Sequence, residues 1–456
     1  MAKASVLRDA VHGDVYLTHE ELAILDTPQM QRLRGVRQLG TAYLVYPSAQ
    51  HSRFEHSIGV AEMARTMIES INRNAASEPA ELLGVPEREE RIIRIAALVH
   101  DCTHVPFGHG IEDQSALFPR HDSAYRFEER FSEKGELGRA LRSIGVHEEV
   151  LAVLSPDRRA ARPVPPYWSQ ILSDTIDADV FDYLRRDALF TGLNLHYDAR
   201  VLAYFKVDRR SGNLFVDLAK HRMLREDILS EIVRVLEARY YFSERVYYHH
   251  AKVAAGALLS KAVEHAMTAG ALAEKELYDT TDSTLLDRLE AAPIRDPAIR
   301  SRVRELTSRF RSRRLLKRAC VYPLETNRGV ADRLVAQYFS PERFEARVAL
   351  ERRIAETVEV ATGRRGLEVV VYCPRRSMQL KEARLHVRWP GVPEVAPLSE
   401  FAHHVPRLRD LEESYRNLWK FYVFVSSDEP AVLRKTREVC ETELPGAVSA
   451  YDPPSE

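Results

Sequence analysis

The stretch HSRFEHS at residues 51–57 decides the fold, together with LVHDCTHVPFGH at 98–109 and DADVFDYLRRD at 177–187. These stretches carry the candidate metal ligands His56, His100, Asp101 and Asp179. Imidazole nitrogens combined with carboxylate oxygens suit a divalent metal, and fewer protein ligands than coordination positions leave room for water and substrate. The sequence therefore predicts a metal centre that is open to a substrate.

Helical patterns accompany each stretch, since apolar residues recur at helical spacing before His100, after His56 and around Asp179. The residues before His100 are Ile92, Ile95, Ala96 and Val99; those after His56 are Val60, Met63, Met67 and Ile71; those around Asp179 are Leu172, Ile176, Tyr183 and Leu184. Buried histidines and aspartates need partners, which a metal would supply, although an isolated His-Asp pair is more often structural. We predict that His56 lies just before a helix and that three helices converge on one ion.

The expected fold is mainly α, with a helical core at 1–290 and a basic helical segment plus a smaller α+β lobe at 291–456. YFKV and LFVDL flank the turn signal RRSGN at 209–213, which predicts a hairpin, and RPVPP at 162–166 predicts a loop. Further strands are expected at LEVVVYC (367–373), ARLHVRW (383–389) and KFYVFVS (420–426), with a last helix near 429–442.

Composition points to a large enzyme in a reducing compartment. A formal net charge of -1 argues against a general polyanion-binding surface. The cysteines 102, 320, 373 and 440 show no paired metal spacing, and neither a signal peptide nor an apolar membrane run is visible. We therefore expect a cytoplasmic protein without membrane partners.

Taken together, the stretches resemble the HD-superfamily phosphohydrolases, specifically the deoxynucleoside triphosphate triphosphohydrolases related to the SAM-and-HD-domain enzyme and to bacterial dGTPases. The resemblance begins at DAVHGDVYL (9–17), continues through DTPQMQRLRGVRQLGTAYLVYPSAQHSRFEHSIGV (26–60) and extends to about His250. It covers more than half of the chain and implies a helical HD-domain core.

The resemblance also assigns a second layer of residues around the metal. His104, His109 and His121 would contact the α-phosphate or support proton transfer, and His109 would protonate the departing nucleoside oxygen. We place His104 on the helical face of His100, while Pro106 and Gly108 let the chain turn before His109. The supporting carboxylate corresponds to Glu112, next to Asp113. Each histidine taken alone could equally be a hydrogen-bonded structural residue.

A set of nucleotide-pocket positions follows from the same resemblance: Gln38, Leu39, Arg53, Tyr183, Asp187, Arg239 and Tyr247. Arginine suits phosphate because its planar donor fork matches phosphate oxygens, although either arginine could form a surface ion pair instead. Leu39 and Tyr247 resemble residues that press on a deoxyribose and exclude a ribose 2′-hydroxyl. The chain departs from the family pattern at Val180, Ser243 and Tyr248, which replace a phosphate-binding lysine, a pocket histidine and a base-side glutamine.

A basic run extends from 300 to 318, where nine arginines or lysines face one acid, Glu305. Such a run is often a solvated helix face. RRLLK at 313–317 nevertheless resembles a family segment that binds a regulatory nucleotide through the equivalents of Arg313 and Lys317. The other half of this site would be Asp26, Gln31 and Arg34, although Ser5 and Arg8 replace an expected lysine and asparagine.

The resulting hypothesis is metal-dependent hydrolysis of dNTPs to deoxynucleoside and inorganic triphosphate. The ligands do not separate Mn, Fe, Mg and Zn. An activating nucleotide and a homo-oligomer such as a tetramer are implied, and nucleic acid is not the favoured partner. The alternatives are an HD phosphodiesterase or nucleotidase acting on another nucleotide, or a non-catalytic nucleotide-sensing or nucleic-acid-binding scaffold, which would bind polynucleotide in a salt-sensitive way without turnover.

Overall fold

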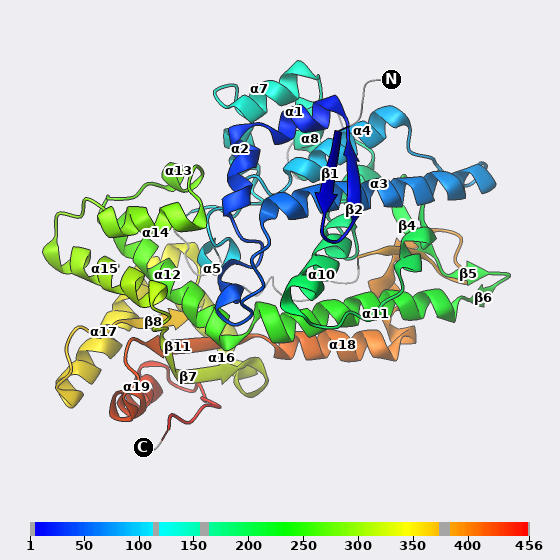
Figure 1. Cartoon of the computed structure of the whole chain (residues 1–456). Helices are drawn as coiled ribbons and strands as arrows, with labels where there is room; N and C mark the ends of the chain where they lie inside the picture. Colours follow the sequence, from blue (N-terminus) through cyan, green and yellow to red (C-terminus); the bar gives the residue numbers. More distant parts are fainter. Residues whose placement is uncertain (1–4, 113–117, 156–163, 374–383, 455–456) are drawn as a thin grey trace.

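The computed structural model describes residues 5–112, 118–155, 164–373 and 384–454, and it is mainly α-helical with small sheets (Figure 1). The N-terminal elements are β1 (Ser5–Asp9), β2 (Gly13–Leu17), α1 (His19–Leu25), α2 (Pro28–Gln31), α3 (Arg53–Ser77), α4 (Glu87–Val99) and α5 (His109–Glu112). Next come α6 (Ala124–Arg130), α7 (Glu136–Ser143), α8 (His147–Leu154), α9 (Pro166–Gln170), α10 (Ala178–Thr191), α11 (Glu226–Phe242) and α12 (His250–Thr268).

The C-terminal part alternates helices and strands. Its helices are α13 (Glu274–Leu277), α14 (Asp282–Ala291), α15 (Pro297–Arg311), α16 (Leu324–Tyr338), α17 (Phe344–Thr362), α18 (Pro406–Asn417) and α19 (Pro430–Glu443). The strands that follow β2 are β3 (Phe205–Val207), β4 (Leu214–Asp217), β5 (Ala219–Lys220), β6 (Met223–Leu224), β7 (Lys317–Pro323), β8 (Val369–Tyr372), β9 (His386–Arg388), β10 (Val395–Pro397) and β11 (Lys420–Val425). The predicted mainly α fold with C-terminal helices and strands is confirmed.

The largest hydrophobic core surrounds α3, which packs against both α4 and α10. Two of the stretches on which the metal prediction rests lie on α3 and α10, and the third begins at the C-terminal end of α4. Burial of their apolar faces is the main force that holds them together, because each buried side chain contributes roughly 1.5–3 kcal/mol. The core thus fixes the three stretches against one another.

Two larger sheets complete the fold. One has the strand order β10-β9-β4-β3, with β4 and β9 parallel, and the other has the antiparallel order β7-β11-β8. The hairpin predicted on either side of RRSGN is β3–β4, and the strands predicted at 367–373, 383–389 and 420–426 contain β8, β9 and β11. Since β9 pairs with β4, residues 385–415 return to the core around α3.

Some local predictions differ from the structure. The basic run is helical only to Arg311, because Arg313 adopts a left-handed conformation with φ 56° and Lys317 begins strand β7. The β1–β2 hairpin was not predicted. Residues 162–163 of the predicted proline-rich loop lie outside the described residues, and the loop ends where α9 begins at Pro166. None of the helices in the described ranges is long and apolar enough to cross a membrane.

Candidate functional site

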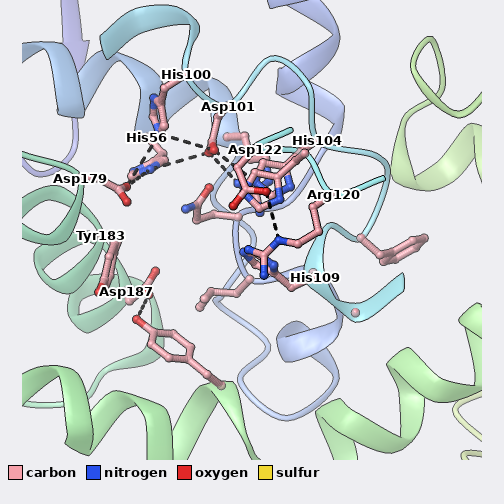
Figure 2. Close-up of a pocket in the computed structure, with 18 of the residues that line it drawn as sticks. His56, His100, Asp101, His104, His109, Arg120, Asp122, Asp179, Tyr183 and Asp187 are labelled. Atoms are coloured by element: carbon pink, nitrogen blue, oxygen red, sulfur yellow. Dashed lines mark hydrogen bonds and ion pairs between the residues drawn. The ribbon is translucent and has the colours of Figure 1, made fainter. Parts of the chain in front are cut away.

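The four candidate metal ligands gather where α3, α4 and α10 meet (Figure 2). Nε2 of His56 lies 2.8 Å from Oδ1 of Asp179 and 3.7 Å from Oδ2 of Asp101. Nε2 of His100 lies 3.5 Å from Oδ1 of Asp101 and 3.8 Å from Oδ1 of Asp179. All four side chains thus present nitrogen or oxygen atoms to one small space.

Local sequence explains how these side chains are presented. Ser52 and Glu55 form a capping box, so α3 begins at Arg53 and His56 lies in its first turn instead of before the helix. Asp177 caps α10 by accepting a hydrogen bond from the Val180 amide at 2.8 Å, which places Asp179 in the first turn. Both ligand candidates therefore lie beside helix N-termini.

The segment after α4 is a turn, which corrects the prediction that His104 shares a helical face with His100. The helix ends at Val99, so His100 is its C-cap residue. Arg32 holds the turn by donating from Nη2 to the carbonyl of His104 at 2.6 Å. At Gly108, φ is 49°, a left-handed conformation that glycine adopts without strain, and a Cβ there would crowd Nη2 of Arg53 at 2.8 Å.

Hydrogen bonding around the histidines fits a divalent metal. Nδ1 of His100 lies 2.7 Å from the Ala97 carbonyl, which only accepts, so this nitrogen carries the hydrogen. Nε2 of His100 therefore bears a lone pair in the neutral ring, and this buried atom has no hydrogen-bond partner among the described residues. His56, His100 and Asp179 also form a group whose ligand atoms lie within 4.8 Å of one another. Two nitrogens and carboxylate oxygens are a donor set that borderline divalent ions accept.

Electrostatics keeps the carboxylates of this cluster ionised. Burial would raise the pKa of Asp101, but Arg53, His100 and His104 outweigh burial and hold it well below its ordinary value. Burial likewise opposes ionisation of Asp179, whose pKa is lowered by its hydrogen bond to His56. The pKa of His56 is depressed by burial yet raised to about 10 by its hydrogen bonds to two aspartates. A cation between His56 and Asp179 would displace that proton.

Three further histidines lie beside this cluster. The rings of His104 and His121 stack with centroids 3.7 Å apart, and His109 meets both rings edge-on. Burial lowers the pKa of His104 and of His121, which favours the neutral form of both rings. Although ligand atoms of this group also lie within 4.8 Å of one another, imidazole lone pairs lie in the ring plane, and two nearly parallel rings cannot aim at one ion. The group is better suited to hydrogen bonding and proton transfer.

Glu112 holds this histidine group in place through hydrogen bonds. Its Oε2 accepts a hydrogen bond from Nδ1 of His121 at 2.8 Å, and its Oε1 accepts from Nη1 of Arg126 at 2.6 Å. Burial opposes ionisation, but His121, His104 and Arg126 hold the pKa of Glu112 well below its ordinary value. Glu112 is therefore the carboxylate that orients a histidine, whereas Asp113 lies outside the described residues.

A cavity of about 450 Å³ joins the metal candidates to the predicted nucleotide residues. Its lining includes His104, His109 and His121 and all the predicted pocket positions: Gln38, Leu39, Arg53, Tyr183, Asp187, Arg239 and Tyr247. Asp187 accepts hydrogen bonds from Tyr247 at 2.6 Å and from Nε2 of His51 at 2.9 Å. Arg53 donates to Asp101 at 2.6 Å, and its buried Nε has no partner among the described residues.

Sequence reasoning missed several residues of this cavity, namely Arg120, Asp122, Lys252, Tyr372 and Tyr415. Tyr372 and Tyr415 come from the C-terminal part of the chain, so no local pattern could have identified them. The hydroxyl of Tyr415 lies 2.7 Å from Oγ of Ser243. Of the departures from the family pattern, Ser243 and Tyr248 line the cavity, whereas Val180 belongs to the hydrophobic core.

The predicted regulatory residues lie outside this cavity. Gln31 donates to the Leu25 carbonyl at 2.8 Å and accepts from Nε of Arg34 at 2.8 Å, while Asp26 is exposed at the end of α1. Arg313 and Lys317 are also exposed, and Arg313 donates to the Leu44 carbonyl at 3.0 Å. Part of the surrounding basic run is paired with acids: Arg311 contacts Asp287 and Glu290, while Arg309 and Arg314 lie near Glu305.

Comparison with known proteins agrees with this architecture. A family model described as the HD domain matches residues 53–187, and one described as the HD associated region matches residues 220–445. An uncharacterized protein of Methanocaldococcus jannaschii is 30% identical over 292 residues, which are 62% of this chain and 54% of that protein.

Other relatives carry a functional name. The deoxynucleoside triphosphate triphosphohydrolase SAMHD1 of Gallus gallus is 28% identical over 270 residues, 54% of this chain and 42% of the relative. The homolog of that enzyme in Dictyostelium discoideum is 32% identical over 213 residues, 45% of this chain and 40% of its own. The chain spans about half the length of the curated relatives it matches. The chain therefore contains an HD domain followed by an HD associated region, the arrangement that these two family models describe.

Proposed function

We propose that this protein is a metal-dependent dNTP triphosphohydrolase that releases deoxynucleoside and inorganic triphosphate. One observation carries the proposal: the candidate metal ligands, the three-histidine group and every predicted position of the substrate pocket line the same cavity. Its volume of about 450 Å³ lies within the usual range of small-molecule sites, roughly 300–1,000 Å³. Similarity to relatives named as triphosphohydrolases supports the same substrate class.

The distribution of charge along α10 supports an oriented nucleotide. Asp179, Tyr183 and Asp187 are spaced four residues apart on this helix and therefore share one face. Near the helix N-terminus, Arg239 donates to the Thr175 carbonyl at 3.4 Å, and the pKa of its partly buried guanidinium is raised by nearby tyrosines and Asp177. This end favours phosphates, because the helix dipole and the arginine are both positive.

The other end of the face suits a neutral sugar. The Asp187 carboxylate would repel phosphates but accepts hydrogen bonds from hydroxyl groups, as it does from Tyr247. Leu39 and Tyr247 would press on the deoxyribose, as the family resemblance implies. We infer that the sugar points towards Asp187 and the polyphosphate towards Arg239, with the α-phosphate beside the metal cluster.

The chain's own residues then have separate roles in hydrolysis of the bond between the α-phosphorus and the 5′-oxygen. When bound, a divalent ion supplies Lewis-acid activation of water and offsets phosphate charge. Arg53 and Arg239 hold the phosphate oxygens. The water gives up a proton as its oxygen bonds to phosphorus and the 5′-oxygen leaves, and His109 gives the departing 5′-oxygen a proton. His104 and His121, held by Asp101 and Glu112, position the α-phosphate.

A nucleotidase or phosphodiesterase acting on another nucleotide is the second candidate. The hydrogen-bonded pair of Ser243 and Tyr415 favours this second candidate. Both residues line the cavity near Arg239, and their hydroxyl groups are neutral. With less positive charge, this region would hold fewer phosphates than a triphosphate carries.

Nucleotide activation through oligomer formation belongs to the same proposal. Asp26, Gln31 and Arg34 of one subunit would contact a regulatory nucleotide together with Arg313 and Lys317 of its neighbour. The exposure of both basic residues supports this arrangement. A ligand that bridges subunits favours the assembled state, because it binds that state more tightly.

Product analysis tests the activity. The purified protein, loaded with Mn²⁺, is incubated separately with dNTPs, NTPs, deoxynucleoside mono- and diphosphates and a cyclic dinucleotide. Chromatography and ³¹P NMR then identify the products. We expect deoxynucleoside and inorganic triphosphate from dNTPs, and slower turnover of NTPs. Release of orthophosphate or pyrophosphate, or cleavage of the cyclic dinucleotide alone, would replace the proposal with the second candidate.

A further inference from the structure

The N-terminal hairpin brings a histidine to the back of the metal cluster. His12 lies in the turn between β1 and β2, and its side chain is only 3% exposed. Its Nε2 lies 2.6 Å from Oδ1 of Asp182, a fully buried carboxylate on α10. The other oxygen of Asp182 lies 2.7 Å from Nδ1 of His56. Asp182 therefore links the hairpin directly to a candidate metal ligand.

Asp182 has its acceptor capacity filled. Oδ1 accepts from His12 and from Nη2 of Arg186 at 2.9 Å, while Oδ2 accepts from His56 and from Nε of Arg186 at 2.9 Å. Two oxygens offer about four lone-pair sites, so four donors fix the orientation of the carboxylate. Because a carboxylate only accepts, Nδ1 of His56 must carry its hydrogen, and in the neutral ring the Nε2 lone pair is left to face Asp179 and Asp101.

The hairpin is held in register with this network. Asp9 accepts backbone hydrogen bonds from Val11 and His12, both at 2.9 Å, which fixes the turn. The same carboxylate accepts from Nη1 and Nη2 of Arg186 at 2.9 and 3.1 Å. Arg186 thus joins Asp9 to Asp182, and the turn is tied to α10 at two points.

Close packing leaves Asp182 little freedom to move. A Cβ at Gly59 of α3 would lie 1.8 Å from Oδ1 of Asp182 and 2.4 Å from Nη2 of Arg186, so the helices approach closely only because residue 59 is glycine. Among the donors that hold Asp182, His12 alone comes from outside α3 and α10 in the described residues. It is therefore the one that can be removed without altering the packing between these helices.

We propose that His12 is a positioning residue of the metal centre: it holds Asp182 so that Asp182 fixes the tautomer and orientation of His56, whose Nε2 then faces the metal. The β1–β2 hairpin is accordingly a structural part of that centre. The inference rests on the metal site of the proposed function. Removing a residue that orients a metal ligand in this way typically weakens metal affinity by about 10- to 100-fold.

The test measures the Mn²⁺ affinity of the whole metal-free chain by competition with a chelating dye. His12→Ala should weaken Mn²⁺ binding by about tenfold or more. His12→Gln, whose amide can still donate to Asp182, should recover most of the loss. Since His12 does not line the cavity, excess Mn²⁺ should restore the turnover of His12→Ala with little change in KM.

His51→Ala is the matched control. His51 forms an equally buried pair with Asp187 on the same helix but does not contact a candidate metal ligand in the described structure. The His51→Ala substitution should raise KM, because Asp187 lines the cavity, and it should leave Mn²⁺ affinity unchanged. Thermal unfolding of the metal-free variants tests for a general loss of structure, which would affect both variants.

The outcomes separate this inference from the metal site itself. Loss of Mn²⁺ binding in His56→Ala, together with wild-type affinity in His12→Ala, would overturn the role of His12 and leave the metal site standing. Unchanged Mn²⁺ binding in His56→Ala would overturn the site and the inference together. Equal losses of affinity in His12→Ala and His51→Ala would also refute the role of His12, because the effect would not be specific to it.

Discussion

Replacing Glu112 by glutamine removes a negative charge from between two buried partners while nearly preserving the shape of the side chain. Glu112 is 1% exposed and accepts hydrogen bonds from Arg126 and His121. Breaking a buried ion pair by removing one partner costs roughly 3–5 kcal/mol. Because the glutamine oxygen can still accept from Arg126, we expect a loss of about 3 kcal/mol. Typical stabilities are roughly 5–15 kcal/mol, so the variant should fold.

The same substitution should slow turnover. The glutamine amide would donate to Nδ1 of His121, so the neutral ring must move its hydrogen to Nε2. The ring would then present a donor where it now presents an acceptor. A misplaced proton in a proton-transfer group typically costs on the order of 10²- to 10⁴-fold, and we expect a loss of about 10²-fold in kcat.

The loss of stability in Glu112→Gln should depend on pH. The pKa of Glu112 is lower in the folded protein than its ordinary value of 4.5. Its ionised form therefore stabilises the fold above about pH 4.5, and this contribution disappears as the pH falls through the folded pKa. The stability gap between wild type and Glu112→Gln should thus be full at about pH 6 and narrower at about pH 3.

Urea unfolding at several pH values, with kcat measured near neutral pH, provides the assay. Glu133→Gln is a matched control, because the Glu133 side chain is 80% exposed and should change neither quantity. A gap that stays constant with pH, or a kcat within twofold of wild type, would refute the role of Glu112 as the carboxylate that orients His121.

The remaining predictions concern the metal, the acid and the regulatory site. Asp101→Ala or Asp179→Ala should lose bound metal and activity together, because each removes a charged ligand, and elemental analysis with rate measurements checks this; full activity at unchanged metal content would exclude the residue as a ligand. His109→Ala should keep its metal but turn over about 10²- to 10⁴-fold more slowly, and near-normal rates would remove it from the acid role. Arg313→Glu should weaken nucleotide-dependent assembly and activation by placing an anion against phosphates. Light scattering and rates across activator concentrations test it, and identical curves for both proteins would reject the regulatory site.

The sequence alone was sufficient wherever chemistry and local structure coincide. The HD-type stretches, the helical spacing around them and the strand patterns near 369, 386 and 420 are properties of short segments. Apolar residues at helical spacing predicted the helix around Asp179, because an α-helix repeats every 3.6 residues. Errors arose at segment ends, where the chain leaves the helix after Val99 and where α3 begins at Arg53.

Only the tertiary structure decided which distant segments share the site. His12 reaches Asp182 across 170 positions of sequence, and Tyr415 reaches Ser243 across 172. The parallel pairing of β9 with β4 returns the C-terminal part of the chain to the core around α3. Contacts of this kind depend on how whole helices pack. Burial of apolar surface is non-directional, so the sequence around a buried residue does not show which distant segment it will contact.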